Sequence, residues 1–174
     1  MYNYDKYNEN NWGNHTTITR ATSTVTDYGP NPFVVDIGKA TERNNTFRTA
    51  LWTGKHLQLT LMNIPVGEDI GLEIHLNNDQ FLCIEDGRGL VQMGNSKDNL
   101  YLNQSVDDDS AIFIPAGTWH NITNTGNEPL KLYSIYAPSA HPKGTVHQTK
   151  AIAEADHRHH FESFSQNTNG YFLY

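Results

Sequence analysis

The chain has 174 residues, with 12 Lys and Arg against 19 Asp and Glu, a formal charge of −7, nine His and one Cys. This length is typical of one domain with its own core, and a single cysteine excludes a framework of internal disulfides. The few basic residues are scattered along an acidic chain, which argues against a nucleic-acid partner.

The sequence also predicts where the protein is found. The chain has no apolar run of about 18 residues that could cross a membrane, and its opening Tyr/Asn-rich stretch is unlike a signal peptide. We therefore expect no membrane partner and a cytoplasmic location. Residues 1–28 predict a polar arm rich in Tyr, Asn and Thr, and a sharper alternative is that this arm adds a strand to a neighbouring subunit.

The centre of the chain predicts an antiparallel β-barrel. After a break at Gly29-Pro30-Asn31-Pro32, Asp36 is placed to cap a short helix that ends near Asn44. Short apolar and β-branched runs then recur at intervals of about ten residues with turn residues between them, which is typical of an all-β sandwich or barrel. The strands are predicted at Phe47–Thr53, His56–Ile64, Gly71–His75, Gln80–Glu85, Gly89–Met93, Leu100–Val106, Ala111–Ile114, His120–Asn124 and Leu130–Ala137. The barrel with its leading helix is assigned to residues 29–140.

Residues 141–174 predict a strap, a C-terminal helix from Thr149 to about Phe161 and a polar tail. His157, His159 and His160 cluster there, and a solvated helix end explains them better than a designed metal site. The polar, aromatic ends of the chain resemble those of proteins that live in assemblies such as spore coats, so one alternative is a non-catalytic role, either in binding a sugar or as a structural, spore-associated protein.

His75 and His120 are placed differently from the other histidines. Alternation along a strand puts Glu73 and His75 on one face. Gln80 begins the next predicted strand, so a hairpin brings its side chain back beside His75. His120 follows the tight turn Pro115-Ala116-Gly117. Cys83 is predicted to lie off the face of Gln80.

Two motifs in these residues resemble those of the cupin superfamily. The first runs from Gly67 through five residues to Glu73-Ile74-His75, then four residues to Gln80 and six to Gly87. Its spacing matches, but Glu73 stands where a His is usual and Gln80 where a Glu is usual. The second runs from Asp109 through Pro115-Ala116-Gly117 and His120 to Asn124, and departs from the family only at Asp109, which replaces a Gly.

The resemblance implies a double-stranded β-helix, or jelly roll, with one divalent metal in its mouth at Glu73, His75, Gln80 and His120. Ligands of these types suit Zn, Fe, Mn, Ni or Co, and a degenerate barrel without metal is the alternative. The set resembles the zinc site of cupin-type mannose-6-phosphate isomerases, although there the Gln and Glu have the opposite chain order. It implies a small-molecule enzyme that acts on a sugar or hydroxy-carbonyl substrate as an aldose–ketose isomerase does, through an enediolate.

Several further roles follow as hypotheses. Lys55, His56, and Tyr133 or Tyr136 are candidate proton shuttles, while Arg48 and Arg88 are candidate ligands of a substrate phosphate. Two His and one carboxylate are also the ligands of non-haem iron dioxygenases, which is the competing enzyme class. The apolar residues on the outer face of the barrel predict a homodimer, on the pattern common among cupins.

Overall fold

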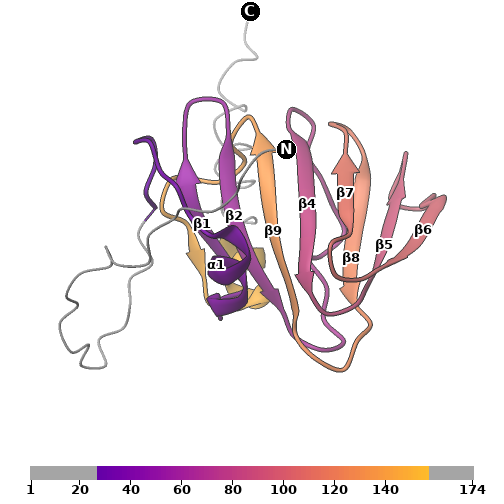
Figure 1. The fold of residues 1–174 in the computed structure, drawn as a ribbon. Helices are drawn as coiled ribbons and strands as arrows, with labels where there is room; N and C mark the ends of the chain where they lie inside the picture. The colour runs from indigo at the N-terminus through magenta and orange to yellow at the C-terminus, as the bar shows by residue number, and fades with distance from the viewer. Residues whose placement is uncertain (1–26, 157–174) are drawn as a thin grey trace, which may run out of the picture.

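The computed structural model describes residues 27–156. Figure 1 shows two antiparallel sheets that face each other, with strand orders β10-β1-β2-β9-β4-β7 and β3-β8-β5-β6. This arrangement confirms the predicted all-β jelly roll. Its elements are α1 Ile37–Arg43, β1 Arg48–Thr53, β2 Gln58–Ile64, β3 Glu73–Ile74, β4 Asp79–Asp86, β5 Gly89–Gly94, β6 Leu102–Val106, β7 Ala111–Ile114, β8 Trp119–Asn124, β9 Leu130–Ala137 and β10 Val146–His147.

The alternation of side chains along each strand determines what fills the barrel. In β9, Leu130, Leu132, Ser134 and Tyr136 are all fully buried, and they belong to the inward-facing half of the strand. The apolar core occupies one part of this interior and includes Met62, Leu82, Ile84, Val91 and Ile122. Polar inward residues such as Gln80 and His120 occupy another part, and these form the candidate site.

Helix α1 is fixed at both ends by side chains. The Asp36 carboxylate accepts a hydrogen bond from the Lys39 backbone N–H at 3.1 Å, which confirms the predicted N-cap. At the other end the Lys131 ammonium donates to the carbonyl oxygens of Glu42 at 3.1 Å and Asn44 at 2.5 Å. A cation at this end of a helix stabilises carbonyl groups that have no partner within the helix. The helix is thereby held against β9 (Figure 1).

The structure differs from the sequence prediction mainly at short elements. The expected strand Gly71–His75 is reduced to the two residues of β3, because Gly71 has a positive φ of 87° that interrupts the extended chain. Strand β10, formed by Val146–His147, was not predicted; it lies in the expected strap and pairs with the start of β1. A helix occupies residues 150–156, in agreement with the start of the predicted C-terminal helix. The remainder of that helix, the arm of residues 1–26 and the histidines of the tail lie outside the described residues.

The Asp27 carboxylate joins three segments of the chain. It accepts hydrogen bonds from the backbone N–H groups of Gly29, Thr53 and Gly144 at 2.9–3.0 Å and from the Thr53 hydroxyl at 2.6 Å. Burial acts to raise the pKa of Asp27, but these bonds outweigh it and hold the pKa below its ordinary value of 3.8. A lowered pKa in the folded state means that the stabilisation is present above the unfolded pKa and is lost as pH falls through the folded one.

We therefore expect Asp27→Asn to lower the free energy of unfolding at pH 7 by about 1–2 kcal/mol, because it weakens these hydrogen bonds. The loss is not larger because the carboxylate is partly exposed to solvent. Urea unfolding measures this, with the exposed Asp98→Asn as control. The difference from wild type should narrow as pH falls below 3.8. An equal difference at pH 7 and pH 3 would show that the carboxylate's charge is not involved.

The outer face of β4, β7 and β9 carries an apolar patch. Phe81 contacts the rings of Phe113 and Tyr133, and Phe113 is 71% exposed at β7, which is the edge strand of its sheet. A cavity of about 290 Å³ lies beside it, lined by Phe81, Phe113 and Ile135 among others. An exposed apolar patch at a sheet edge is the kind of surface from which the homodimer was predicted. The homodimer stays a prediction that light scattering on the full chain would test.

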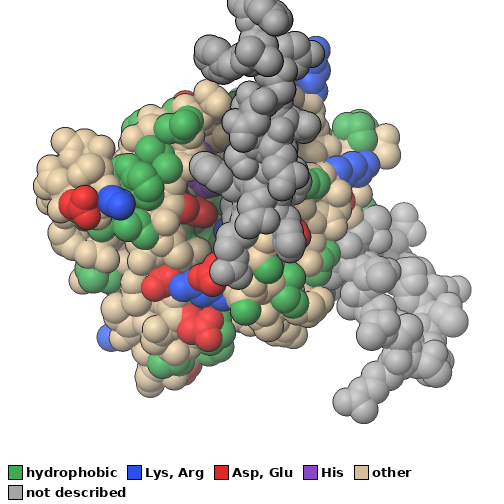
Figure 2. Space-filling view, turned by 180° about the vertical axis from the view of Figure 1, so that it is seen from behind, with side chains coloured by type: hydrophobic (Ala, Val, Ile, Leu, Met, Phe, Trp, Pro, Cys, Tyr) green, Lys and Arg blue, Asp and Glu red, His purple; other side chains and the backbone are tan. Residues whose placement is uncertain are grey.

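The surface of the molecule mixes both signs of charge. On the face shown in Figure 2, basic side chains are scattered among acidic ones, and histidine reaches the surface in one small patch. Among residues 27–156, no helix is long and apolar enough to cross a membrane.

Candidate metal centre

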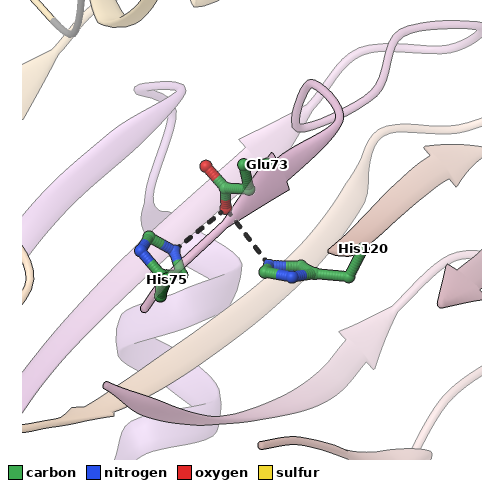
Figure 3. Close-up of side chains that lie close together, drawn as sticks. All are labelled: Glu73, His75 and His120. Carbon is green, nitrogen blue, oxygen red and sulfur yellow. Dashed lines mark ion pairs between the residues drawn. The ribbon is translucent and has the colours of Figure 1, made fainter. Parts of the chain in front are cut away.

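Three potential ligands converge inside the barrel from two neighbouring strands. Glu73 of β3 pairs directly with His120 of β8, and His75 follows β3 immediately. Their side chains point toward one another in Figure 3, with Glu73 Oε1 3.4 Å from the Nε2 atoms of both His75 and His120. One ligand atom from each residue lies within 4.8 Å of the others. The predicted grouping of Glu73, His75 and His120 is therefore present in the structure.

These ligand atoms are buried and lack hydrogen-bond partners. The side chains of His75 and Glu73 are 14% and 18% exposed, and that of His120 is fully buried. Within the described part of the chain, Glu73 Oε1, His75 Nε2 and His120 Nε2 make no hydrogen bond. A buried polar atom without a partner is costly, so three of them at one point indicate that something else completes their coordination.

The orientation of His120 is set by its backbone surroundings. Its Nδ1 lies 2.9 Å from the carbonyl oxygen of Thr118. A carbonyl only accepts hydrogen bonds, so Nδ1 carries a proton, and in the neutral imidazole Nε2 then presents its lone pair toward Glu73. This is the usual arrangement of a metal-binding histidine, whose second nitrogen donates to an oxygen that fixes the ring.

Gln80 has a matching arrangement on β4. Its side chain is 4% exposed, and its Nε2 donates to the Ser134 hydroxyl at 2.9 Å. This bond turns the amide so that Oε1 is buried without a partner. Gln80 pairs with Tyr136 across the sheet, and the Tyr136 ring contacts that of His75 at 5.4 Å between centroids. The fourth predicted ligand thus belongs to the same polar interior as the other three.

The electrostatics of the cluster favour a charged carboxylate. Burial acts to raise the pKa of Glu73, but contacts with His120 and His75 and the positive charge of Arg48 outweigh it, and the pKa lies well below its ordinary value. The lowered pKa leaves Glu73 ionised at neutral pH. A negative charge between two imidazoles favours the binding of a divalent cation.

The donor set fits a transition metal. Metal–ligand bonds of about 2.1 Å in a tetrahedral arrangement separate neighbouring ligand atoms by about 3.4 Å, which is the distance from Glu73 Oε1 to each imidazole nitrogen. Imidazole suits Zn, Fe, Ni and Cu, and one carboxylate with an amide oxygen excludes none of the metals predicted from the sequence. The residues that would hold the ion are Glu73, His75 and His120, with Gln80 Oε1 as a fourth ligand.

The structure does not bring all the proposed proton shuttles to this cluster. Lys55 and His56 are exposed in the hairpin between β1 and β2. Tyr133 lies on the outer face of β9, against Phe81 and near Cys83, and burial raises its pKa to about 12. Tyr136 lies on the inner face, fully buried, because it is three residues away on a strand whose faces alternate. Of the tyrosines considered, Tyr136 is the one beside the metal centre.

Two hydroxyl groups that the sequence analysis did not single out also belong to the site. Ser134 accepts the hydrogen bond from Gln80, and the Ser134 and Thr60 hydroxyls lie near that of Tyr136. The signal that could have identified them is the alternation of β9 and β2, which places both on the inner faces. Burial, the largest influence, raises the pKa of Tyr136, so its phenol stays protonated at neutral pH and is available as a hydrogen-bond donor.

Comparison with known proteins agrees with this geometry. A family model described as a cupin domain matches residues 60–136, which include Glu73, His75, Gln80 and His120. The uncharacterized protein YrkC of Bacillus subtilis is 71% identical over 129 residues, covering 74% of this chain and 69% of that protein. The chain belongs to the cupin superfamily.

Solved structures support the same assignment. The crystal structure of BH2720 from Bacillus halodurans is 70% identical to this cupin, with a TM-score of 0.75 over 75% of this chain and 99% of that one. The structure of TT1209 from Thermus thermophilus is 19% identical, with a TM-score of 0.52 over 60% of this chain and 96% of that one, and shows the shared fold alone.

Proposed function

We propose that this cupin is a metal-dependent enzyme that acts on a small hydroxy-carbonyl compound, a class that includes sugars, in the manner of an aldose–ketose isomerase. The observation that carries the proposal is the set of three buried ligand atoms, on Glu73, His75 and His120, that converge on one point and make no hydrogen bond within residues 27–156. One carboxylate among the ligands leaves a divalent ion with a net charge of about +1, which suits it to polarise a carbonyl group and acidify the neighbouring C–H bond.

The protein's own groups have distinct parts in this proposal. Glu73, His75, Gln80 and His120 hold the ion, and the bond from Gln80 to Ser134 keeps the amide oxygen turned to the interior. The Tyr136 phenol lies against the His75 ring on one side and the His141 ring on the other, at centroid distances of 5.4 and 5.1 Å. Because burial keeps this phenol protonated, it would donate a hydrogen bond to a substrate oxygen and stabilise the negative charge that develops there.

The test separates metal binding from chemistry. The full chain is purified without added metal, its metal content is measured by plasma emission, and the protein is then loaded with Zn, Mn, Fe, Ni or Co. Each form is incubated with hydroxyacetone in D2O, and proton NMR follows loss of the C–H signal beside the carbonyl. We expect exchange with at least one metal and a clear reduction in Tyr136→Phe, which retains the ring but lacks the hydroxyl.

Tyr101→Phe is the matched control, because Tyr101 is 69% exposed. Stoichiometric metal binding without exchange of any hydroxy-carbonyl probe would contradict the enzymatic part of the proposal. Absence of bound metal under all loading conditions would contradict it entirely.

A second candidate function is supported by the same three residues. Two imidazoles and one carboxylate around one point are the ligand set of non-haem iron oxygenases. Iron in the protein as purified, together with oxygen uptake that depends on an added diol or enol, would favour the dioxygenase and count against the isomerase.

A further inference from the structure

Arg48 is a buried cation inside the barrel. It is the first residue of β1 and pairs with Met62 of β2, whose side chain belongs to the core. Its side chain is 1% exposed and is among the largest fully buried side chains of the described residues. The guanidinium lies over the Phe47 ring, with its central carbon 5.6 Å from the ring centroid.

The guanidinium has no anionic partner in residues 27–156. No carboxylate oxygen in this part of the chain lies within 4.0 Å of it, and its buried Nε atom makes no hydrogen bond. Arginine stays charged in proteins, and a buried charge without a partner is strongly unfavourable. Stability alone does not account for this residue, whereas a bound anion would.

Arg48 faces the interior that holds the candidate metal centre. It pairs with Met62 of β2, which pairs with Leu132 of β9, and the side chains of Leu132 and Tyr136 are both buried on the inner face of β9. Arg48, Glu73 and Tyr136 therefore share one interior. Glu73 is not its ion-pair partner, and with a divalent ion bound the carboxylate would be occupied by the metal. The ion, Glu73 and Arg48 together would carry a net charge of about +2, which attracts anions in a low-dielectric interior.

We propose that Arg48 binds an oxyanionic group of the substrate, so that the enzyme acts on an anionic hydroxy-carbonyl compound in preference to a neutral sugar. The inference rests on the proposed function, because the anion is taken to be part of the molecule held at the metal centre. Carboxylate and phosphate both fit the planar fork of a guanidinium, and the experiment distinguishes them.

Three probes that differ in one group test the proposal. Hydroxyacetone is neutral, hydroxypyruvate has a carboxylate in place of its methyl group, and dihydroxyacetone phosphate adds a phosphate. Calorimetric titration of the zinc-loaded full chain should show at least one anionic probe binding about ten- to a hundredfold more tightly than hydroxyacetone. Which anion is preferred identifies the group that Arg48 recognises.

Arg48→Met should remove this preference while leaving zinc content and the weak binding of hydroxyacetone unchanged. Arg88→Met is the matched control, since Arg88 is exposed and is the other arginine that the sequence suggests for an anion. Thermal unfolding adds a readout independent of activity. In the absence of anions Arg48→Met should melt at the wild-type temperature or above it, because it removes an unpaired buried charge, and only the wild type should be stabilised by phosphate.

If Arg48→Met does not fold, Arg48→Lys takes its place; it keeps the charge, loses the fork and should bind the preferred anion about tenfold more weakly. Equal binding of the three probes by the wild type would overturn the inference. So would an anion preference of wild-type size in the Arg48 variants. The rise in melting temperature caused by phosphate is also measured on the metal-free chain. If the metal-free wild type shows this rise and the metal-free Arg48 variant does not, the anion site is supported even where the metal proposal has failed.

Discussion

Glu73→Gln is expected to weaken zinc binding by about a hundredfold. The substitution keeps the size of the side chain and an oxygen at the ligand position, but it removes the negative charge that lies 3.4 Å from both imidazoles. Loss of a residue that merely supports a ligand costs about ten- to a hundredfold in metal affinity, so loss of the charged ligand belongs at the upper end or beyond. Competition with a chromophoric chelator measures the affinity.

The design has to exclude binding elsewhere. His157, His159 and His160 are themselves able to bind zinc, so all comparisons use a chain in which these three are replaced by Asn. Glu68→Gln is the matched control, because Glu68 is exposed and lies five residues before Glu73. Wild-type affinity in Glu73→Gln would show that the cluster of Glu73, His75 and His120 is not the metal site.

The position of this cluster could be predicted from sequence because it depends on local geometry. Alternation along an extended chain places Glu73 and His75 on one side even though β3 contains only Glu73 and Ile74. The turn at Pro115-Ala116-Gly117 then starts β8 in a register that sets His120 opposite Glu73. Spacing along the chain was therefore sufficient to group these ligands.

The proton shuttles were harder to predict because they depend on which face of a distant strand turns inward. Lys55 and His56 precede β2 and remain in its exposed hairpin, since β2 begins only at Gln58. Tyr133 and Tyr136 both lie on β9, and the two residues between them, Ser134 and Ile135, do not reveal which tyrosine faces the interior. The burial of Lys131 at the end of α1 could not be anticipated either, because that contact joins residues far apart in the chain.

The burial of Arg48 could not be predicted from the sequence for a different reason. Arginine is rarely fully buried without a partner, so a strand pattern alone does not indicate that its side chain lies inside the barrel. The structure places it there because β1 pairs with β2 in a register that sets Arg48 opposite the core residue Met62. Its place in the interior that also holds the candidate metal centre depends on how the two sheets close, which no local pattern encodes.

The last residue of the second motif has a structural part that differs from that of the ligands. Asn124 is 2% exposed at the end of β8, and its Nδ2 donates to the carbonyl oxygens of Ile64 at 2.9 Å and Glu128 at 2.8 Å. Its Oδ1 accepts a hydrogen bond from the Gly126 N–H at 2.9 Å. One side chain thus joins the end of β2 to the turn between β8 and β9.

Asn124→Ala is expected to lower the free energy of unfolding by about 3 kcal/mol, because it leaves the buried carbonyl of Ile64, the partly buried carbonyl of Glu128 and the N–H group of Gly126 without their partner. Zinc affinity at a temperature where the variant is folded should equal that of the wild type, since Asn124 is not among the ligands. Urea unfolding and chelator competition measure the two quantities, with the exposed Asn127→Ala as control, expected within about 0.5 kcal/mol of wild type. A fall in zinc affinity without loss of stability would assign Asn124 to the candidate metal centre. A loss of stability with unchanged zinc affinity would separate Asn124, which supports the barrel, from His120, the candidate ligand in the same motif.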